Sequence, residues 1–402
     1  MVTYEGLFEA YLDCRRRKSR TINCVKFTLD YETRLLDMVE AINDKTYRPT
    51  RSICFVVTRP KYREVFAADF ADRIIHHWIR LRLEPLMELA FNDRTFNCRQ
   101  GKGTLNGVYQ LERDIKECSE NYTKDCYAMR VDIQSFFMSI SKQEIEKIVD
   151  DFIVERYKKD DVDDLRWLCH VVLSNHPEEN CIKQSSEELW SMLPPNKSLF
   201  TNDYDCGMPI GNLPSQMFAN FLLNDVDWMI DEITPYHGRY VDDIFAVHQD
   251  RQVLLDLVPK IRKALWNHGL KLSRDKFYIQ HYSKGISFTG AIIKPGRKYP
   301  MNHTVDSFEA SVLRLNKCKN LEQIEKALAS VNSYLGLMIH YDSYAIRRNI
   351  LSEIDSKLFK YIYIKGHFEV VSLKKKYTPL YRVKRDIKKK FYYKRISLPG
   401  PL

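Results

Sequence analysis

The sequence lacks the features that mark secreted, zinc-bound and membrane-spanning proteins. Its ten cysteines stand singly at irregular spacings, without a C-x-x-C pair or a Cys/His cluster, so we expect reduced thiols rather than disulfides or structural zinc. The first residues show no charged start followed by an apolar stretch, and no apolar run is long enough to cross a bilayer. We therefore expect an intracellular protein with no membrane partner. No internal repeat is present.

The composition is that of a folded chain with an excess of positive charge. Hydrophobic residues make up 44% of 402 residues, enough for more than one domain with its own core. The net charge is +10, and basic residues crowd positions 15–18 and 357–395, where Tyr and Phe are interspersed. Cations neutralise phosphates and aromatic rings stack on bases, so both segments are candidates for RNA contact. A solvated tail is the alternative for the second segment.

Regular apolar spacing predicts helices that alternate with short apolar strands. Helices are predicted over residues 5–45, 71–90, 107–118 and 253–268, over most of 141–200, throughout 304–360, and after a start at 212–214. Strands are predicted at 52–58 and 128–131 and in a pair that begins at 285–294. The polar stretch at 177–188 is predicted to be an exposed insertion. Strands interleaved with helices and followed by a helical end favour an α/β catalytic core with an appended helical domain.

Two adjacent carboxylates, Asp242 and Asp243, lie between short apolar runs, as at the tip of a β-hairpin. Like charges at a turn are unfavourable unless a cation shares them, and Mg²⁺ takes oxygen ligands; a turn that favours Asp for backbone reasons alone is the alternative. Asp132 follows the predicted buried strand at 128–131. Such carboxylates can hold two metal ions for phosphoryl transfer. We predict Asp132, Asp242 and the carbonyl of Ile133 as metal ligands, while Asp243 either binds metal directly or supports the ligands.

These residues resemble the catalytic motifs of reverse transcriptases. Asp132 followed by Phe136 and Phe137 is similar to the family's first carboxylate motif, and the YVDD tetrapeptide at 240–243 matches its YxDD box. The resemblance implies an α/β right-hand polymerase fold with fingers, a palm of antiparallel sheet plus helices, and a helical thumb. It also implies RNA-directed DNA polymerase activity, with template RNA, cDNA and dNTPs as partners and two Mg²⁺ ions as cofactor, Mn²⁺ being the alternative ion.

The resemblance extends to residues that would contact the incoming nucleotide. Phe137 holds the place of the aromatic side chain that lies under the sugar in the family, which implies selection of dNTPs; core packing is the alternative. Segments 61–65 and 72–75 resemble parts of the fingers. Arg63 and Arg73 are the candidates for gripping the triphosphate, because guanidinium groups match phosphate oxygens. A surface ion pair with Asp69 or Asp72 is the alternative for Arg73.

Other segments follow the family's order along the chain. Residues 96–104 are similar to a fingers motif that touches template and nucleotide, and 288–290 resemble the primer-grip turn. Residues 269–276 resemble the motif in which a lysine faces the pyrophosphate, so Lys276 is the candidate general acid, with Lys271 as the alternative. The predicted domains are N-terminal helices and fingers at 1–125, a palm at 126–300 with a helical insertion at about 141–205, a helical thumb at 301–360 and a basic C-terminal extension at 361–402.

One segment departs from the common bacterial pattern. Where most bacterial reverse transcriptases carry Q-G-x-x-x-S-P, residues 210–216 read I-G-N-L-P-S-Q. Ile210 and Gln216 at its ends resemble the reverse transcriptases of diversity-generating retroelements. Because the segment lies against the nascent base pair in the family, Ile210, Gly211 and Gln216 are assigned to substrate binding, and Tyr240 of the YxDD box is assigned to substrate binding as well. Loss of a hydrogen-bonding Gln would relax discrimination between nucleotides; ordinary packing is the alternative for Ile210.

This subgroup implies a particular biology. Its members copy a template-repeat RNA into cDNA with frequent errors opposite adenine, and the cDNA is transferred to a variable gene by mutagenic retrohoming. The implied partner is a small basic accessory variability protein, expected to be oligomeric, in the cytoplasm of a bacterial or phage-infected cell. Acidic runs at 160–164 and 178–179 could dock such a partner, with solvated surface as the alternative. The rival functions are a retron-like or defence-associated reverse transcriptase and a non-catalytic RNA-binding scaffold.

Overall fold

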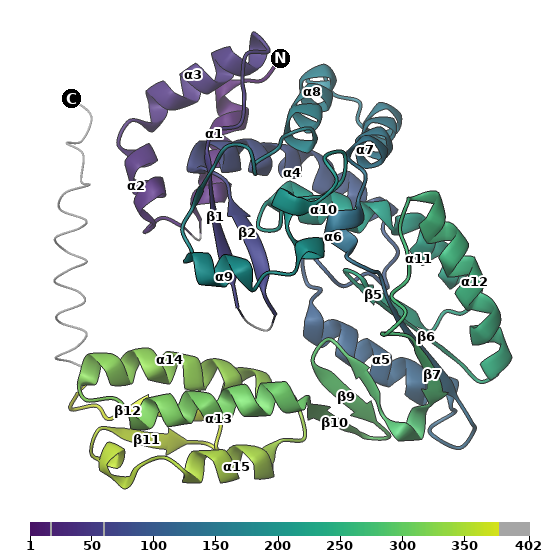
Figure 1. Ribbon diagram of the computed structural model, residues 1–402, viewed down its shortest axis with the longest axis vertical. Helices are drawn as coiled ribbons and strands as arrows, with labels where there is room; N and C mark the ends of the chain where they lie inside the picture. The colour runs from purple at the N-terminus through teal and green to yellow at the C-terminus, as the bar shows by residue number, and fades with distance from the viewer. Residues whose placement is uncertain (17, 59–60, 378–402) are drawn as a thin grey trace. The chain divides into compact units, whose positions relative to one another are not determined.

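The computed structural model describes residues 1–16, 18–58 and 61–377 (Figure 1). The chain divides into two compact units between His281 and Tyr282, whereas the predicted palm extends to residue 300. The assignment of residue ranges to fingers, palm and thumb remains a prediction. Within the predicted basic extension, β11 (Ile362–Lys365) and β12 (Val370–Leu373) form an antiparallel hairpin. From residue 378 onward, that extension lies outside the described residues.

A four-stranded antiparallel sheet carries the carboxylate motifs. Its strand order is β5 (His237–Tyr240), β6 (Asp243–His248), β3 (Tyr127–Asp132) and β7 (Tyr278–His281). Strand β6 lies inside the sheet, and five of its six residues are buried, which explains its nearly continuous apolar sequence. Helices α5 (Thr104–Cys118) and α12 (Arg251–Asn267) pack against these strands. We call this sheet the palm sheet.

A second sheet of three strands lies in the same unit. Strands β1 (Ser52–Val57) and β2 (Arg63–Ala67) form an antiparallel hairpin, and β4 (Cys181–Lys183) pairs with β1 in parallel. Strand β4 comes from the stretch predicted to be an exposed insertion. Two of its three residues are indeed exposed, and a strand of three residues is too short to show an alternation of apolar and polar positions in the sequence. The strand nevertheless ties this segment to the β1–β2 hairpin.

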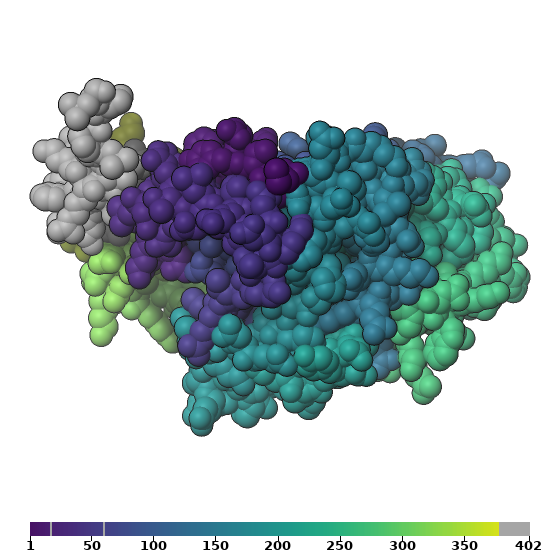
Figure 2. Space-filling view, turned by 90° about the horizontal axis from the view of Figure 1, so that it is seen from above, coloured from purple at the N-terminus to yellow at the C-terminus, as the bar shows by residue number. Residues whose placement is uncertain are grey.

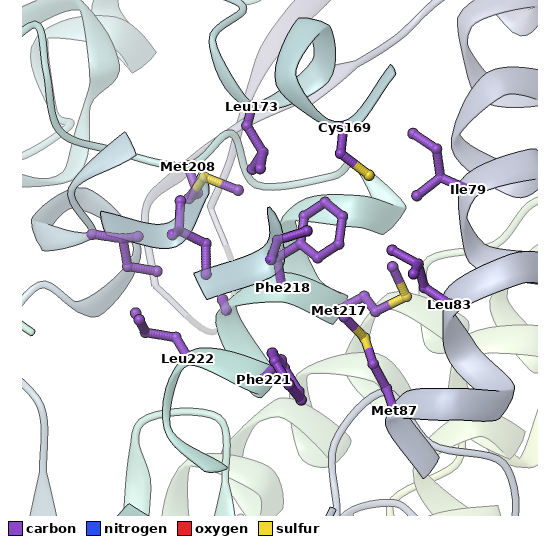
Figure 3. Packing of buried hydrophobic residues seen from close by; sticks show 14 of the residues in the cluster. Ile79, Leu83, Met87, Cys169, Leu173, Met208, Met217, Phe218, Phe221 and Leu222 are labelled. Atoms are coloured by element: carbon purple, nitrogen blue, oxygen red, sulfur yellow. The ribbon is translucent and has the colours of Figure 1, made fainter. Parts of the chain in front are cut away.

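Helices bury the largest part of the core. Helix α4 (Phe70–Ala90) confirms the helix predicted at 71–90 and continues through Pro85; the Asp69 carboxylate caps it by accepting from the amide of Ala71 at 3.0 Å. Side chains of α4 meet those of α8 (Val162–Leu173) and α10 (Leu213–Leu222) around Phe218, which is fully buried (Figure 3). This core supports the palm sheet.

The N-terminal part forms three helices where one long helical stretch is predicted. They are α1 (Tyr4–Arg15), α2 (Ile22–Thr28) and α3 (Tyr31–Asn43). Helix α1 packs on α4, and the segment containing α7 (Lys142–Arg156) and α8 lies beside the N-terminal helices (Figure 2). The buried carboxylate of Asp164 links the two segments, because it forms ion pairs with Lys45 and with the amino terminus.

The second unit has its own core. A small antiparallel sheet, β8 (Ile286–Phe288), β9 (Ala291–Lys294) and β10 (Arg297–Pro300), precedes α13 (Asn302–Asn316), α14 (Leu321–Met338) and α15 (Tyr344–Ser352). Apolar residues of these helices pack with β11 and β12. The segment predicted as primer grip, 288–290, comprises the last residue of β8 and the two-residue turn that leads to β9. Among the described helices, none combines the length and apolarity that crossing a bilayer requires.

Replacing one buried leucine of α4 should test the packing in Figure 3. Leu83 is fully buried, so Leu83→Ala should lower the free energy of unfolding by about 2–5 kcal/mol, through lost burial and the cavity left behind. Leu89, on the same helix, is 85% exposed, and Leu89→Ala should change it by less than about 0.5 kcal/mol. Urea unfolding followed by circular dichroism measures both; equal effects would contradict the described packing.

Candidate active site

The structure brings the predicted carboxylates to one end of the palm sheet. Asp132 ends β3 and is paired directly with Asp243, the first residue of β6. Asp242 lies in the two-residue turn that joins β5 to β6. The amide of Ile133 donates to the carbonyl of Asp242 at 3.1 Å. Asp132 and Asp243 are buried and Asp242 is half-buried, so residues separated by about a hundred positions form one polar site in an otherwise apolar sheet.

The turn that carries Asp242 has a strained backbone. Val241 has a φ of 60°, while Asp242 does not have a positive φ among the described residues, a pattern that fits a type II′ hairpin turn. Positive φ is unfavourable for a β-branched residue and costs about 1–3 kcal/mol unless the surroundings enforce it. One contact holds each of the two peptide groups that flank Val241: the Val241 amide donates to Asn97 Oδ1 at 2.9 Å, and the Val241 carbonyl accepts from Arg239 Nη1 at 3.2 Å.

A buried polar network lies behind this turn. The Arg239 guanidinium is fully buried and donates to both carboxylate oxygens of Asp227, at 2.8 and 2.6 Å. Its Nη1 also donates to Asn220 Oδ1 at 3.0 Å, and Asn220 Nδ2 donates to the carbonyl of Asn97 at 3.1 Å. The network therefore connects both contacts of Val241 to α10 and α11 (Asn224–Asp231). Sequence analysis missed it; a charged residue inside a short buried strand was the available signal.

Asp243 is held by an arginine that sequence analysis also missed. Arg130, two residues before Asp132 on β3, donates to Asp243 Oδ1 and Oδ2 at 2.6 and 2.7 Å. Within the described parts of the chain, no group of three or more His, Cys, Asp or Glu side chains is placed to hold a metal ion. Two roles are predicted for Asp243, direct binding of metal and support of the metal ligands. The two hydrogen bonds from Arg130 favour the second role.

The carboxylates repel one another and are balanced by cations. Burial and the neighbouring Asp132 raise the pKa of Asp242, while Lys276 and Arg63 act in the opposite direction. Burial raises the pKa of Asp243 to about 6; Arg130 opposes the rise, and Asp242 and Asp132 add to it. Asp132 and Asp242 supply oxygen donors of the kind that a hard divalent cation such as Mg²⁺ takes, and such a cation would relieve the repulsion between these two carboxylates.

The two candidate general acids differ in position. Lys276 Nζ lies 2.6 Å from Asp132 Oδ1, whereas Lys271 Nζ lies over the ring of Trp266, 5.7 Å from its centroid. The backbone of this segment runs along the loop after Asp132, because the Ser273 amide donates to the Asp132 carbonyl at 2.8 Å. Of the two lysines, the structure places Lys276 at the carboxylates.

The two predicted phosphate-binding arginines lie in different surroundings. Arg63, the exposed first residue of β2, is close enough to Asp242 to lower its pKa. Arg73 lies on α4 near Lys18, whose pKa is lowered by burial and by Arg73, so it belongs with the N-terminal basic segment. Asp69 caps α4 and Asp72 accepts from Tyr47 and Thr50, which leaves the predicted ion-pair alternative for Arg73 unsupported.

The remaining predicted substrate contacts fall into two groups. Phe137 and Ile210 are half-buried and pack on a small cluster of Cys54, Phe66, Met138 and Leu199. Tyr240 and Gln216 instead lie near Cys98, whose Sγ donates to Gln216 Oε1 at 3.2 Å. Burial raises the pKa of Tyr240, and the neighbouring Cys98 adds to the rise.

Gly211 follows Ile210 at a close approach of two backbones. The Ile210 carbonyl accepts from the Phe66 amide at 2.8 Å, and Gly211 has a φ of 116°. A Cβ at Gly211 would lie 2.6 Å from the Phe66 carbonyl oxygen, so a side chain at this position would collide with β2. The glycine therefore keeps the 210–216 segment against the strand that begins with Arg63.

The fold is an α/β right-hand polymerase fold. It is defined by the antiparallel palm sheet, the helices that pack against it and the turn that carries Asp242. A family model described as reverse transcriptase (RNA-dependent DNA polymerase) matches residues 50–293, more than half of the chain. The chain belongs to the reverse transcriptase family.

Solved structures that match this chain include telomerases from two Candida species. Apo telomerase from Candida tropicalis is 13% identical, with a TM-score of 0.45, over 78% of this chain and 58% of that one. Telomerase from Candida albicans with a fragment of telomeric RNA is 11% identical, with a TM-score of 0.44, over 78% and 57%. The chain thus spans less than two thirds of these telomerase chains. No curated protein matches its sequence significantly.

Variants of the Arg239–Asp227 pair should separate its effect on the free energy of unfolding from its effect on the position of the turn that carries Asp242. Asp227→Asn removes the counter-charge of a buried guanidinium and should destabilise the protein by about 3 kcal/mol. A double Arg239→Met, Asp227→Leu variant removes both charges and should recover much of that loss in urea unfolding. Its primer-extension rate should remain low, because the Val241 carbonyl has lost its donor.

The Arg82–Asp161 ion pair, 2.7 Å between nitrogen and oxygen, provides the control outside the turn. Asp161→Asn should leave primer extension unchanged. A double variant that extends primers at the native rate would show that the network does not position the turn.

The pKa of Asp243 predicts the acid side of the pH–rate profile. With a pKa of about 6, its carboxyl takes up a proton as the pH falls from 7 to 5, and the rate of primer extension should fall with it. Arg130→Met removes the cation that lowers this pKa, so the acid limb should move to higher pH, whereas Arg130→Lys should move it less. Single-turnover rates between pH 5 and 8.5 measure the shift; an unmoved limb would exclude Asp243 as the titrating group.

Proposed function

We propose that this protein is a reverse transcriptase that makes error-prone, adenine-mutagenised cDNA from a template-repeat RNA for retrohoming into a variable gene. The observation that carries the polymerase part is the convergence of Asp132 and Asp242 at one end of the palm sheet. A scaffold that only binds RNA has no need for clustered carboxylates whose repulsion raises a pKa. We place the reaction in the cytoplasm of a bacterial or phage-infected cell.

Asp132, Asp242 and the carbonyl of Ile133 are the groups proposed to hold two Mg²⁺ ions, or Mn²⁺ as the alternative. When bound, such ions activate the primer 3′-hydroxyl and stabilise the charge of the departing pyrophosphate. Arg130 keeps Asp243 oriented beside the ligands, through two hydrogen bonds. The buried network keeps Asp242 in place through the Val241 peptide.

Other side chains would act directly on the nucleotide. Lys276, held 2.6 Å from Asp132 Oδ1, can donate a proton to the leaving pyrophosphate. Arg63 is exposed beside the carboxylates and can bind phosphate oxygens. Phe137 is the proposed contact for the sugar, where an aromatic ring leaves no room for a 2′-hydroxyl.

The mutagenic part of the proposal rests on Ile210 and Gln216. Ile210 packs on the same cluster as Phe137, so an apolar side chain stands near the proposed sugar contact where a Gln would offer a hydrogen bond. Fidelity corresponds to a free-energy difference of a few kcal/mol between the transition states for the correct and the incorrect nucleotide. The free energy lost with one orienting hydrogen bond is of the same size. A retron-like or defence-associated enzyme would be expected to copy adenine faithfully.

The proposed partners include the template RNA and a small basic accessory protein, expected to be oligomeric. Several of the acidic side chains suggested for docking are engaged within the chain: Asp161 with Arg82, Asp164 with Lys45, and Glu178 with His176. Asp160, Asp163 and Glu179 are exposed. Any docking of a basic partner on these runs therefore depends on the exposed residues.

Primer extension on an RNA template with Mg²⁺ and dNTPs tests the proposal, with sequencing of the cDNA. We expect product from the native chain, no product from the double Asp242→Ala, Asp243→Ala variant, and errors concentrated opposite template adenines. Asp37→Asn, which changes an exposed carboxylate on α3, should behave like the native chain. Faithful cDNA would favour a retron-like or defence-associated reverse transcriptase. If no cDNA forms even with the cognate RNA and the accessory protein, a non-catalytic RNA-binding scaffold would be favoured.

A further inference from the structure

A buried carboxylate next to Arg63 has no place in the mechanism above. Glu64 is fully buried on β2, with its side chain on the opposite face of the strand from exposed Arg63. Its Oε2 accepts from Ser198 Oγ at 2.6 Å, and its Oε1 accepts from the amide of Leu199. Burying a charge is expensive unless hydrogen bonds compensate it, and both donors here come from one distant segment. Glu64 thus acts as an anchor for residues 198 and 199.

The same segment is anchored a second time, to the loop after Asp132. Asn196 Nδ2 donates to Ser135 Oγ at 3.2 Å, and Ser135 itself has a left-handed backbone with a φ of 47°. The turn is closed by Thr201 Oγ1, which donates to the Pro195 carbonyl at 2.7 Å. Lys197 lies between the two anchors, so its backbone is fixed between the strand of Arg63 and the loop that follows Asp132.

Lys197 lies within electrostatic reach of three further cations. The pKa of Lys197 is lowered by burial and then by Lys61, Lys276 and Arg63, while Asp132 acts in the opposite direction. Like charges repel one another, so such an arrangement is unfavourable unless negative charge compensates it. The carboxylates of Asp132 and Asp242 account for part of the positive charge, and a polyanion accounts for the rest. The triphosphate of a nucleotide is the polyanion that a site with metal-binding carboxylates would receive.

We propose that Lys197 is a further phosphate-binding residue for the incoming nucleoside triphosphate, and that Glu64 is a positioning residue that holds the Lys197 segment over the site through Ser198 and Leu199. The proposal rests on the proposed function as a polymerase. It assigns a role to the 195–199 turn, which lies in the region predicted as a helical insertion. Lys197 would approach the phosphates from the side of that insertion, and Lys61 and Arg63 from the β1–β2 hairpin.

Steady-state primer extension with varied dNTP tests this role. Lys197→Gln should raise the KM for dNTP about tenfold, the size of one charge-assisted hydrogen bond, and change kcat less than about threefold. It should weaken inhibition by pyrophosphate by a similar factor, and Lys197→Arg should restore most of both. Lys183→Gln removes the same charge from the same region, where Nζ lies over the ring of Phe200, and should leave KM unchanged.

Glu64→Gln separates positioning from general stability. It should raise the KM for dNTP in the same direction as Lys197→Gln, and the double variant should have a KM no higher than that of Lys197→Gln alone. Additive losses in kcat and KM, together with a lower Tm, would show that Glu64 is only structural. An unchanged KM and unchanged pyrophosphate inhibition in Lys197→Gln would overturn the role of Lys197.

Equilibrium binding keeps this inference distinct from the polymerase proposal. Native and Lys197→Gln protein are titrated with dNTP in a complex with RNA template and a dideoxy-terminated primer. Weaker dNTP binding by the variant supports Lys197 even where catalysis fails, and equal binding overturns it. A native protein that makes no cDNA in the first assay counts against the polymerase proposal alone.

Discussion

The site depends on a guanidinium group that is withdrawn from solvent. The charge of Arg239 is balanced by Asp227, and its Nη1 also donates a hydrogen bond to the carbonyl of Val241. A β-branched residue does not adopt a positive φ by itself, so the turn exists because the tertiary structure holds its peptide from both sides. Asp242 is the next residue, and its position relative to Asp132 follows from that restraint. Burial makes the contact strong, since the local dielectric is low and water does not compete.

Charge balance links the carboxylates to their surroundings. Asp132 contacts Lys276, and Asp243 contacts Arg130, so two of the three negative charges already have a protein partner. A metal ion that bound Asp132 through Oδ1 would share that oxygen with the ammonium group of Lys276, the proposed general acid. Arg130 instead neutralises Asp243 at the edge of the cluster. The same sheet thus provides one carboxylate that can exchange partners and one that is held.

Three separate segments surround this cluster, and each is fixed by a backbone or buried contact. The β1–β2 hairpin is joined to the 210–216 segment where Gly211 allows close approach. The 195–199 turn is joined to the same hairpin through Glu64. The segment containing Lys276 follows the loop after Asp132. Because these contacts share β2 and the Asp132 loop, a change at one would be transmitted to the others. The proposed nucleotide site therefore lies where these segments meet.

Local sequence determined the elements that carry the chemistry. Apolar periodicity predicted the helix now seen as α4 and the strand now seen as β1, and the YVDD tetrapeptide between apolar runs predicted the hairpin and its carboxylates. These features are local, because periodicity and turn chemistry act over a few residues. Only the tertiary structure paired Arg130 with Asp243, Arg239 with Asp227 and Glu64 with Ser198. Those partners are distant in sequence or meet through side chains alone, so no local spacing marks them, and burial decides which charges must find each other.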